Sequence, residues 1–265
     1  MNRFKKDSLE VRVAESRAAL GLAAAEAVCA GIASVLERKP VANVMFAAAP
    51  SQNEFLAALV TMPVDWSRVN GWHMDEYLGL DVNAPQRFGH FLRERLFGKV
   101  PFREVFYMSG AGGSAEGQEG EAECRRYAAL LRTHPTDIVV LGIGENTHLA
   151  FNDPHVARFD DPEMVKVVRL DEACRRQQVN DGCFTRLAEV PERAMTVTIP
   201  GLMRADRIYG VVPGPRKAGA VAITLSAEIT EAHPATVLRR HPRAVLFLDP
   251  DSAAQAGDGS YLAQG

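Results

Sequence analysis

The chain has few cysteines, and their spacing argues against two kinds of site. Its 265 residues include four cysteines, Cys29, Cys124, Cys174 and Cys183, and no two of them form a Cys-x-x-Cys pair. Zinc cages and disulfide frameworks both depend on characteristic cysteine spacings. We therefore expect no metal site and four reduced thiols, as is typical of proteins in the cytoplasm.

The chain also lacks a strong charge imbalance and a long apolar run. Its formal net charge is -3, so we expect neither a nucleic-acid partner nor attraction to an anionic membrane. No apolar segment approaches the roughly 18 residues that a membrane-spanning helix needs. No apolar signal core follows the first residues. These absences predict a soluble cytoplasmic protein.

Three common motifs of ligand binding and catalysis are missing as well. The pair Gly142 and Gly144 is followed by Thr147 where a dinucleotide fingerprint has its third glycine. The sequence contains no Walker lysine loop and no G-x-S-x-G element around a nucleophilic serine. These absences argue against NAD binding and against acyl transfer to a serine.

Short apolar segments alternate with helical patterns along the chain. Predicted strands cover 41–47, 68–74, 104–108, 138–141, 164–170, 194–199, 207–212 and 244–248, and predicted helices cover 8–38, 55–59, 88–97, 121–132, 171–181 and 218–225. This alternation predicts an α/β fold, an open, mostly parallel Rossmann-like sheet with helices on both faces. We expect one such domain over residues 1–250 and a flexible tail over 251–265.

The most informative stretch begins with the predicted strand 138–141. The strand is apolar and rich in β-branched residues, and it ends at Gly142 and Gly144, where the backbone can turn sharply or let a ligand approach. A cluster of polar side chains follows directly: Asn146, His148, Asn152 and Asp153. Because open α/β sheets bind ligands at the carboxyl ends of their strands, we expect an edge of the active site here.

Two further segments carry polar groups at predicted strand ends. Asp75 and Glu76 follow the strand 68–74, and in an extended chain these neighbours point to opposite sides, so only one faces a pocket. Lys217 begins a late helix. A carboxylate, a histidine with an acidic neighbour and a lysine together suit acid–base chemistry on a small anionic substrate.

The loop after the first predicted strand contains Ser51 and Gln52. Ser51 has the position of a helix N-cap, with Glu54 as its capping-box partner. Free backbone N–H groups at the same helix start can hold an anion such as phosphate. The two roles are compatible with each other.

Two motifs together resemble the glucosamine-6-phosphate deaminase/isomerase family. The segments Met74-Asp-Glu-Tyr-Leu-Gly79 and Gly142-Ile-Gly-Glu-Asn-Thr-His-Leu-Ala-Phe-Asn-Asp-Pro154 are similar to M-D-E-Y-x-G-L and G-x-G-x-D-G-H-I-A-F-N-E-P in that family. The helix that contains Cys124 and Tyr127 between them is also similar. The likeness extends from the first predicted strand to the strand at 244.

The resemblance implies an aldose–ketose isomerisation with loss of ammonia from a phosphorylated amino sugar, without metal or redox cofactor. Asp75 would shuttle a proton between C1 and C2. His148 would open the sugar ring, and Asp153 stands where the family has a glutamate. Lys217 is similar to the phosphate-binding lysine. The family includes monomers and hexamers, so a homo-oligomer is compatible with the resemblance.

The chain departs from the family pattern at several positions. The family aspartate two residues before the histidine is Asn146 here, which can bond an imidazole but cannot offset the charge of an imidazolium, and this predicts slower ring opening. Ser51 and Gln52 replace the family's phosphate loop, and the family's phosphate arginine has no clear counterpart. We expect Ser51, Gln52, Gly144 and Lys217 to bind the substrate.

Two alternatives remain open. 6-Phosphogluconolactonases share the fold, but their D-E-R and D-G-H-T-A-S-L-F-P motifs fit Tyr77 and residues 149–154 less well. The chain could also be a sugar-phosphate-binding regulator without activity. Asn146 and the altered phosphate loop favour that reading, whereas the presence of both Asp75 and His148 argues against it.

Overall fold

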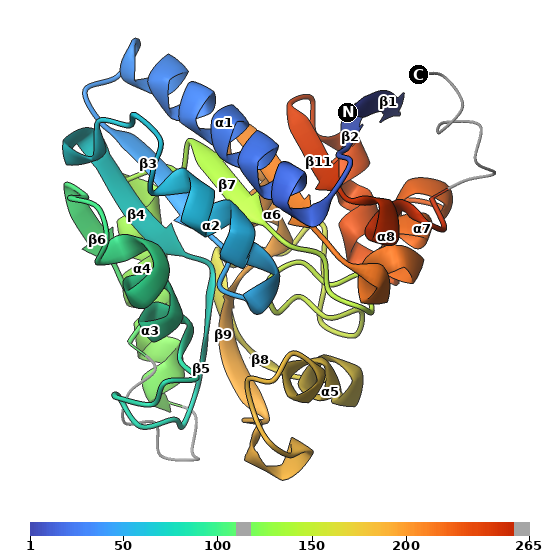
Figure 1. Ribbon diagram of the computed structural model, residues 1–265. Coiled ribbons are helices and arrows are strands. Elements are labelled where there is room, and N and C mark those ends of the chain that lie inside the picture. Colours follow the sequence, from blue (N-terminus) through green and yellow to red (C-terminus); the bar gives the residue numbers. More distant parts are fainter. Residues whose placement is uncertain (110–117, 257–265) are drawn as a thin grey trace.

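A single large sheet forms the centre of the molecule (Figure 1). The computed structural model describes residues 1–109 and 118–256. The strands of the large sheet lie in the order β1-β2-β11-β10-β7-β3-β4-β6. Only β1 is antiparallel to its neighbour, and the other pairs are parallel. Their bounds are Asn2–Lys6 (β1), Leu9–Val13 (β2), Ala42–Phe46 (β3), Val69–His73 (β4), Glu104–Phe106 (β6), Ile138–Leu141 (β7), Arg207–Val212 (β10) and Ala244–Leu248 (β11).

The strand order contains a topological switch point between β3 and β7. The chain winds outward from β3 through β4 to β6, and then returns to β7 and winds the other way through β10 to β11. The loops that leave β3 and β7 therefore diverge, although the two strands are hydrogen-bonded neighbours. Open α/β sheets bind their ligands in the crevice at such a point.

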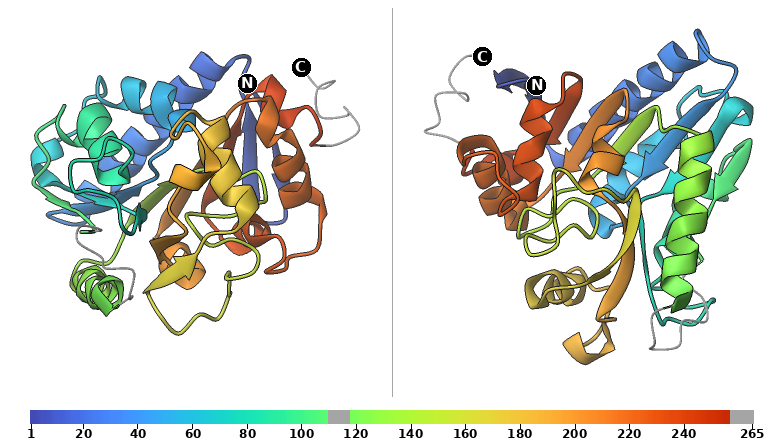
Figure 2. Two further views of the ribbon diagram at one scale, coloured as in Figure 1. Left: turned by 90° about the horizontal axis from the view of Figure 1, so that it is seen from below. Right: turned by 180° about the vertical axis from the view of Figure 1, so that it is seen from behind.

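Helices cover both faces of the large sheet, as predicted (Figure 2). Along β7, Ile138 and Val140 pack on one face while Val139 and Leu141 pack on the other, as the period-2 geometry of a strand requires. The first face is covered by α1 (Arg17–Leu36), α2 (Asn53–Leu59), α3 (Phe88–Leu92) and a π-helical turn at Arg93–Phe97. The second is covered by α4 (Gln118–Thr133), α6 (Ile199–Met203) and α7 (Ala218–Ser226).

A small antiparallel sheet lies beyond the carboxyl ends of the central strands. It consists of β5 (Asp75–Tyr77), β9 (Arg193–Val197) and β8 (Val165–Arg169), in that order. Helix α5 (Glu172–Asn180) lies beside it at the bottom of Figure 1. Only Met74 separates β4 from β5. The small sheet therefore fixes the backbone of Asp75 at the edge of the crevice.

The start of the chain differs from the prediction. The helix predicted from residue 8 begins at Arg17, after the N-cap Ser16, whose side chain accepts a hydrogen bond from the Ala19 N–H. Residues 9–13 form β2, in which buried and partly exposed side chains alternate. The strands predicted at 164–170 and 194–199 exist as β8 and β9, but they belong to the small sheet and not to the parallel one.

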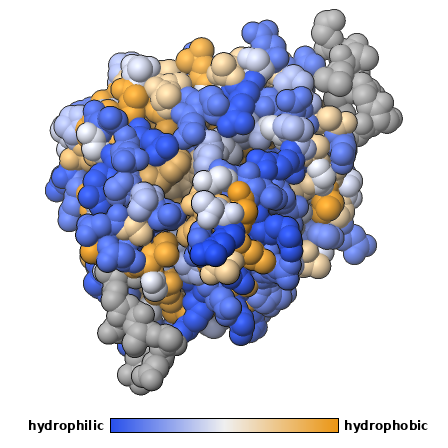
Figure 3. All heavy atoms as spheres, turned by 60° about the horizontal axis from the view of Figure 1, so that its bottom comes forward, coloured by the Kyte–Doolittle hydropathy of each residue, from blue (hydrophilic) through white to orange (hydrophobic). Residues whose placement is uncertain are grey.

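Helix α1 corrects the expectation about apolar runs. It is long and apolar enough to cross a membrane by length and composition alone. Core helices of water-soluble proteins often have the same length and apolar composition. One side of α1, including Ala24, Val28 and Ile32, is fully buried in the core beneath it. On the face of the molecule in Figure 3, hydrophobic side chains are scattered among hydrophilic ones.

The remaining described elements are short. Helix α8 (Pro250–Ala253) is capped by Asp249. It includes residues 251–253, the first residues of the predicted tail. Residues 257–265 of that tail lie outside the described residues. Short 3-10 turns occur at Pro50–Gln52, Trp66–Arg68, Leu187–Glu189, Pro215–Lys217 and Pro234–Arg240.

Candidate active site

A pocket opens at the switch point, at the carboxyl ends of β3, β4, β7 and β10. It brings together five of the residues that the sequence singled out, Ser51, Asp75, Gly144, His148 and Lys217. Gln52, Asn146 and Asp153 are not part of its lining. The rest of the wall comes from residues that the sequence analysis did not assign to the site: Ala47, Ala48, Ala49, Met74, Phe88, Gly142, Ile143, Ala150, Phe151, Gln177 and Gln178.

Asp75 contributes a buried carboxyl group to the pocket. Its exposed fraction is 6%, and its side chain forms no hydrogen bond with any group in the described part of the chain. Burial raises the pKa of Asp75 well above its usual value, and the neighbouring charge of Glu76 raises it further. A carboxylate held this way is a stronger base than one in water.

Glu76 points away from the pocket, as the alternation of an extended chain predicts. Its carboxylate accepts hydrogen bonds from the N–H groups of Tyr77, Phe88 and Gly89 at 2.9, 3.2 and 3.1 Å. It also lies 3.5 Å from the guanidinium Nε of Arg87. Burial raises the pKa of Glu76 despite these partners. Glu76 thus anchors the start of α3, and Asp75 alone faces the pocket.

His73 holds the backbone of Asp75 from behind. Its Nδ1 lies 2.9 Å from the Asp75 carbonyl oxygen, and its Nε2 accepts a hydrogen bond from the Met108 N–H at 2.8 Å. Burial lowers the pKa of His73 to about 4. The ring is therefore neutral at pH 7, donates from Nδ1 and accepts at Nε2. The sequence analysis passed over this residue because it stands inside an apolar strand.

The loop after β7 folds tightly around the imidazole of His148. The Gly144 N–H donates to the His148 carbonyl oxygen at 2.9 Å, and Thr147 has a φ of 70°. A Cβ atom at position 144 would lie 2.2 Å from Cε1 of His148. Real side chains do not approach that closely, so glycine is required because the ring occupies the space.

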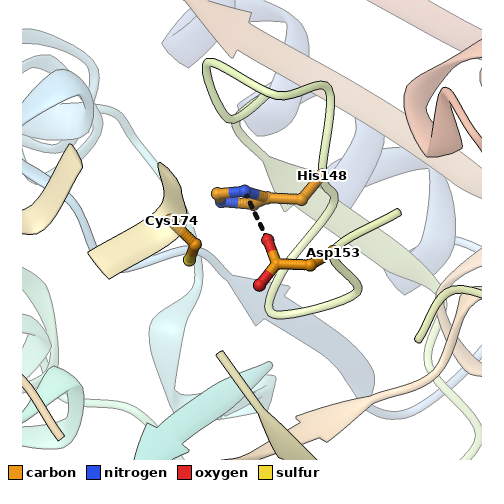
Figure 4. Close-up of side chains that lie close together, drawn as sticks. All are labelled: His148, Asp153 and Cys174. Atoms are coloured by element: carbon orange, nitrogen blue, oxygen red, sulfur yellow. Dashed lines mark ion pairs between the residues drawn. The ribbon is translucent and has the colours of Figure 1, made fainter. Parts of the chain in front are cut away.

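Two acceptors orient the His148 ring. Its Nδ1 lies 2.6 Å from Asn146 Oδ1 and 3.1 Å from Asp153 Oδ1. Figure 4 shows the imidazole and the Asp153 carboxylate facing each other. Because both neighbours accept, the proton of a neutral ring resides on Nδ1. Nε2 has no hydrogen-bond partner among the described residues and is the ring atom left to meet a ligand.

Asp153 is fully buried beneath the ring and is surrounded by donors. Its oxygens accept from Asn146 Nδ2 at 3.1 Å and from the backbone N–H of Asp171 at 3.1 Å, in addition to His148. Burial opposes its ionisation, but the hydrogen bonds from His148 and Asn146 outweigh burial and hold the pKa of Asp153 below its usual value. The site therefore contains an ionised carboxylate behind a histidine.

His148, Asp153 and Cys174 lie close enough to hold a metal ion. The sulfur of Cys174 approaches the same carboxylate from α5 (Figure 4). Burial, followed by the charges of Asp153 and Asp171, raises the pKa of the Cys174 thiol well above its usual value. In the absence of an ion, the neutral thiol of Cys174 therefore belongs to the hydrogen-bonded network around Asp153.

Lys217 adds a buried positive charge to the wall of the pocket. Its exposed fraction is 7%, and its ammonium group forms no hydrogen bond or ion pair within the described ranges. Burial lowers the pKa of Lys217, although Asp181 and Glu145 oppose that shift. A buried ammonium group without a partner is costly unless an anion binds beside it. This position therefore suits the anionic end of a ligand.

The loop after β3 differs from the prediction in detail. Ser51 lies in the pocket wall but does not cap α2, because the cap position is Gln52 and no side chain forms a cap hydrogen bond there. The predicted capping box with Glu54 is therefore wrong. Gln52 is buried behind the wall, where its Nε2 donates to the Val211 carbonyl oxygen at 3.0 Å. This bond ties the loop after β3 to β10.

Helix α5 adds two glutamines that the sequence analysis did not select. Gln177 and Gln178 are buried and line the pocket. The Gln177 side-chain oxygen accepts from the Glu145 N–H at 2.9 Å, which fixes the loop before His148. Gln178 forms no side-chain hydrogen bond in the described part of the chain. Their only signal in the sequence is an amide pair in the helix predicted at 171–181.

Comparison with known families gives a match over most of the chain. Residues 15–247 match the family described as glucosamine-6-phosphate isomerases/6-phosphogluconolactonase. A glucosamine-6-phosphate deaminase from Streptococcus pneumoniae serotype 4 is 35% identical over 199 residues, which cover 75% of this chain and 81% of that protein.

Solved structures show the same relationship. A monomeric glucosamine-6-phosphate deaminase superposes with a TM-score of 0.81 at 27% identity, and the match covers 92% of this chain and 99% of that one. The 6-phosphogluconolactonase from Trypanosoma brucei gives a TM-score of 0.77 at 17% identity, covering 96% and 100%. The second likeness shows the fold alone.

Proposed function

The chain belongs to the glucosamine-6-phosphate isomerase/6-phosphogluconolactonase family, and we propose that within it the protein is a glucosamine-6-phosphate deaminase. The reaction converts a phosphorylated amino aldose to a ketose phosphate and ammonia. The observation that carries the proposal is the meeting of Asp75, His148 and Lys217 in one pocket at the switch point. Each is buried, and each has a polar group without a protein partner in the described ranges.

Asp75 is the proposed base that removes the proton from C2 of the substrate. In the open-chain amino sugar, removal of the C2 proton with protonation of O1 gives an enolamine. Return of the proton to C1, with loss of one proton from nitrogen, then leaves an alcohol at C1 and an imine at C2. Water hydrolyses the imine to a ketone and ammonia. A carboxylate whose pKa is raised by burial is suited to the carbon-to-carbon transfer, because the higher pKa makes it a stronger base toward the C2 proton.

His148 is the proposed group that opens the sugar ring. With its proton on Nδ1, the free Nε2 can accept the proton of the anomeric hydroxyl and deliver it to the ring oxygen as the C1–O5 bond breaks. Asp153 and Asn146 keep the ring in the orientation and tautomer that this step requires. No metal or redox cofactor is needed for either step.

Lys217 and the loop containing Ser51 are the proposed phosphate site. The ammonium group of Lys217 supplies a positive charge after the carboxyl end of β10. The hydroxyl group of Ser51 adds a donor after the carboxyl end of β3. We further propose that the unpartnered amide of Gln178 hydrogen-bonds the substrate. The family's phosphate arginine has no counterpart in the pocket lining among the described residues, so Lys217 is the cation on which phosphate recognition depends.

The deaminase is favoured over the lactonase by specific observations. The relative at 35% identity is a deaminase, whereas the lactonase from Trypanosoma brucei shares only the fold. Two residues after Asp75, buried Tyr77 stands where the lactonase motif has an arginine. A hydrolytic lactonase therefore remains the second candidate.

A comparison of two substrates tests the choice directly. The purified protein is incubated with glucosamine 6-phosphate and, separately, with 6-phosphogluconolactone, and ammonium release and lactone loss are measured. We expect ammonium release from the amino sugar and no lactone hydrolysis above the spontaneous rate. The reverse pattern would establish the lactonase instead.

The cellular location, the partners and the domain organisation of the enzyme are also proposed. We infer a cytoplasmic enzyme that acts on a small sugar phosphate and binds neither nucleic acid nor membrane, consistent with its balanced net charge of -3. We retain the single catalytic domain over residues 1–250, and helix α8 continues the ordered chain to Ala253. Association into a homo-oligomer is compatible with the proposal, and sedimentation of the purified chain measures it.

A further inference from the structure

Asn146 connects two carboxylates that lie behind the imidazole of His148. Its amide Nδ2 lies 3.1 Å from Asp153 Oδ1 and 3.0 Å from Asp171 Oδ2. Both distances fit N–H donation to a carboxylate oxygen. The amide Oδ1 therefore faces the other way, toward His148 Nδ1 at 2.6 Å. One neutral amide thus joins two anions to one imidazole.

Asp171 is held firmly in this arrangement. Its Oδ1 accepts from the Cys174 N–H at 2.6 Å and caps α5, while its own N–H donates to Asp153 Oδ2 at 3.1 Å. No lysine or arginine forms an ion pair with Asp171 within the described ranges. Its negative charge is therefore directed at the amide of Asn146 and at the start of the helix.

The two carboxylates act on the amide together. Negative charge on the N–H side polarises the amide and makes its oxygen a stronger acceptor for the imidazole N–H. An aspartate at position 146 would replace both N–H···O contacts with contacts between like-charged oxygens at about 3 Å, which repel strongly in a buried site. The presence of Asp171 therefore makes an amide the suitable neighbour for His148.

We propose that Asp171 is a positioning residue for His148 and acts on it through the amide of Asn146. The negative charge that the family resemblance places at position 146 is displaced to position 171, and Asn146 relays it. This replaces the expectation that Asn146 simply weakens ring opening. The proposal rests on the proposed function, because it assigns His148 a role in turnover.

A double-mutant cycle on the full chain tests the proposal. Asp171→Asn keeps an oxygen for the helix cap, but it removes the charge and turns an N–H2 group toward the amide Nδ2 of Asn146. We expect Asp171→Asn alone to lower kcat about fivefold with KM changed less than about twofold, and Asn146→Asp alone to lower kcat about 30-fold. In the Asn146→Asp background, Asp171→Asn should instead raise kcat at least about threefold.

The reversal of sign distinguishes an action of Asp171 through residue 146 from an independent structural role of Asp171 at the start of α5. If Asp171→Asn lowers kcat in both backgrounds, or leaves it unchanged in both, the proposal is overturned. Glu172→Gln is the matched control, because this exposed carboxylate lies in the same first turn without contacting Asn146. Its kcat should equal that of the wild type.

The same four proteins give a readout that does not depend on turnover. The melting temperature should fall with Asp171→Asn in the wild-type background and rise with it in the Asn146→Asp background. If the wild type releases no ammonium from glucosamine 6-phosphate, the proposed function fails, while this reversal still supports the charge arrangement. Equal melting-temperature changes in both backgrounds would refute the arrangement itself.

Discussion

At the scale of single residues, the site consists of charged groups held in the protein without their usual partners. Asp75 and Lys217 are both buried in the pocket wall, and neither side chain is paired within the described ranges. Burying such groups costs free energy that folding must supply from elsewhere. A bound substrate would give a partner to each of the two groups. The site therefore favours a ligand that has an acidic carbon for Asp75 and an anionic end for Lys217.

Asp75→Asn should therefore stabilise the protein while inactivating it. The pKa of Asp75 is raised above its usual value of 3.8 in the folded state. Its contribution to stability is fully present below that value and is lost as pH rises through the folded pKa. We expect the variant to gain about 1 kcal/mol at pH 7, or about 2–4 °C in melting temperature, and nothing near pH 3.5.

Calorimetry at the two pH values measures this difference. Glu76 serves as the contrast, because its carboxylate accepts three backbone N–H groups. Glu76→Gln should destabilise the protein at pH 7, since it removes the acceptor at the start of α3. An Asp75→Asn variant that melts at a lower temperature than the wild type at pH 7 would show that the carboxyl group is partnered in solution.

Lys217→Met should affect binding more than turnover. Removing the buried ammonium group leaves the phosphate with hydroxyl and backbone donors alone, so we expect KM to rise at least about tenfold, which corresponds to one charge-assisted contact. Arg216→Met is the control, because that neighbouring arginine is exposed and pairs with Asp181. Steady-state kinetics that show equal KM changes in both variants would argue against a specific phosphate contact.

At the scale of elements, the loop after β7 is the part of the structure that shapes the catalytic histidine. Its path is set by Gly144, by the left-handed backbone at Thr147 and by the amide of Asn146 below the ring. Three separate constraints on one loop hold the His148 ring in one orientation. Such preorganisation is what a proton-transfer site requires.

Gly144→Ala tests the loop. The new Cβ atom must displace the His148 ring, which would cost about 1–3 kcal/mol in stability and lower kcat at least about 100-fold through misplacement. Gly142→Ala is the matched control for stability, because its Cβ atom would come no closer than 3.4 Å to a neighbouring heavy atom, Nε2 of Gln52. Thermal melts and kinetics of both variants measure the difference. Equal losses of stability in both would contradict the geometric argument.

The sequence predicted this element well because its signals are local. The apolar run at 138–141, the glycines and the polar residues after them are contiguous, and the burial of all four residues of β7 agrees with them. By contrast, β2 was included in a helix because residues 9–13 precede α1 closely and carry helix-compatible residues. It pairs with the adjacent strand β1 on one side and, on the other, with β11, more than 200 residues later. No local pattern reports such a partner.

The contacts of Asp171 and Gln178 escaped prediction for the same reason. Both belong to the stretch from β8 through α5, which packs under the pocket only because β8 pairs with β9 in a second sheet. The sequence of α5 is polar, and nothing in it indicates that one side of the helix is buried. Its polar residues became candidates only when the fold placed them beside His148 and the pocket.

At the scale of the whole molecule, the reversal of winding direction between β3 and β7 explains why residues far apart in sequence meet. Ser51, Asp75, His148 and Lys217 each follow the carboxyl end of a different central strand. The parallel arrangement brings these ends to one edge. Ligand binding there should therefore clamp several strand ends together and stabilise the entire domain.

A melting experiment with ligand tests this coupling. At a concentration 100 times its dissociation constant, a sugar phosphate should stabilise the protein by about 2.7 kcal/mol. The same sugar without phosphate should stabilise it far less, because it lacks the partner of Lys217. Equal shifts for both ligands would place the binding outside the proposed site. Stabilisation without any turnover would instead identify the regulator that was considered as an alternative.

The most direct test of the central claim is the reaction itself. Glucosamine 6-phosphate is incubated with the wild type and with Asp75→Asn at equal concentration, and ketose phosphate and ammonium are quantified by nuclear magnetic resonance. The account predicts equimolar fructose 6-phosphate and ammonium, formed at least about 1000-fold faster by the wild type, since the variant lacks the carboxylate base. Equal rates in the two proteins, or no ammonium from either, would contradict it.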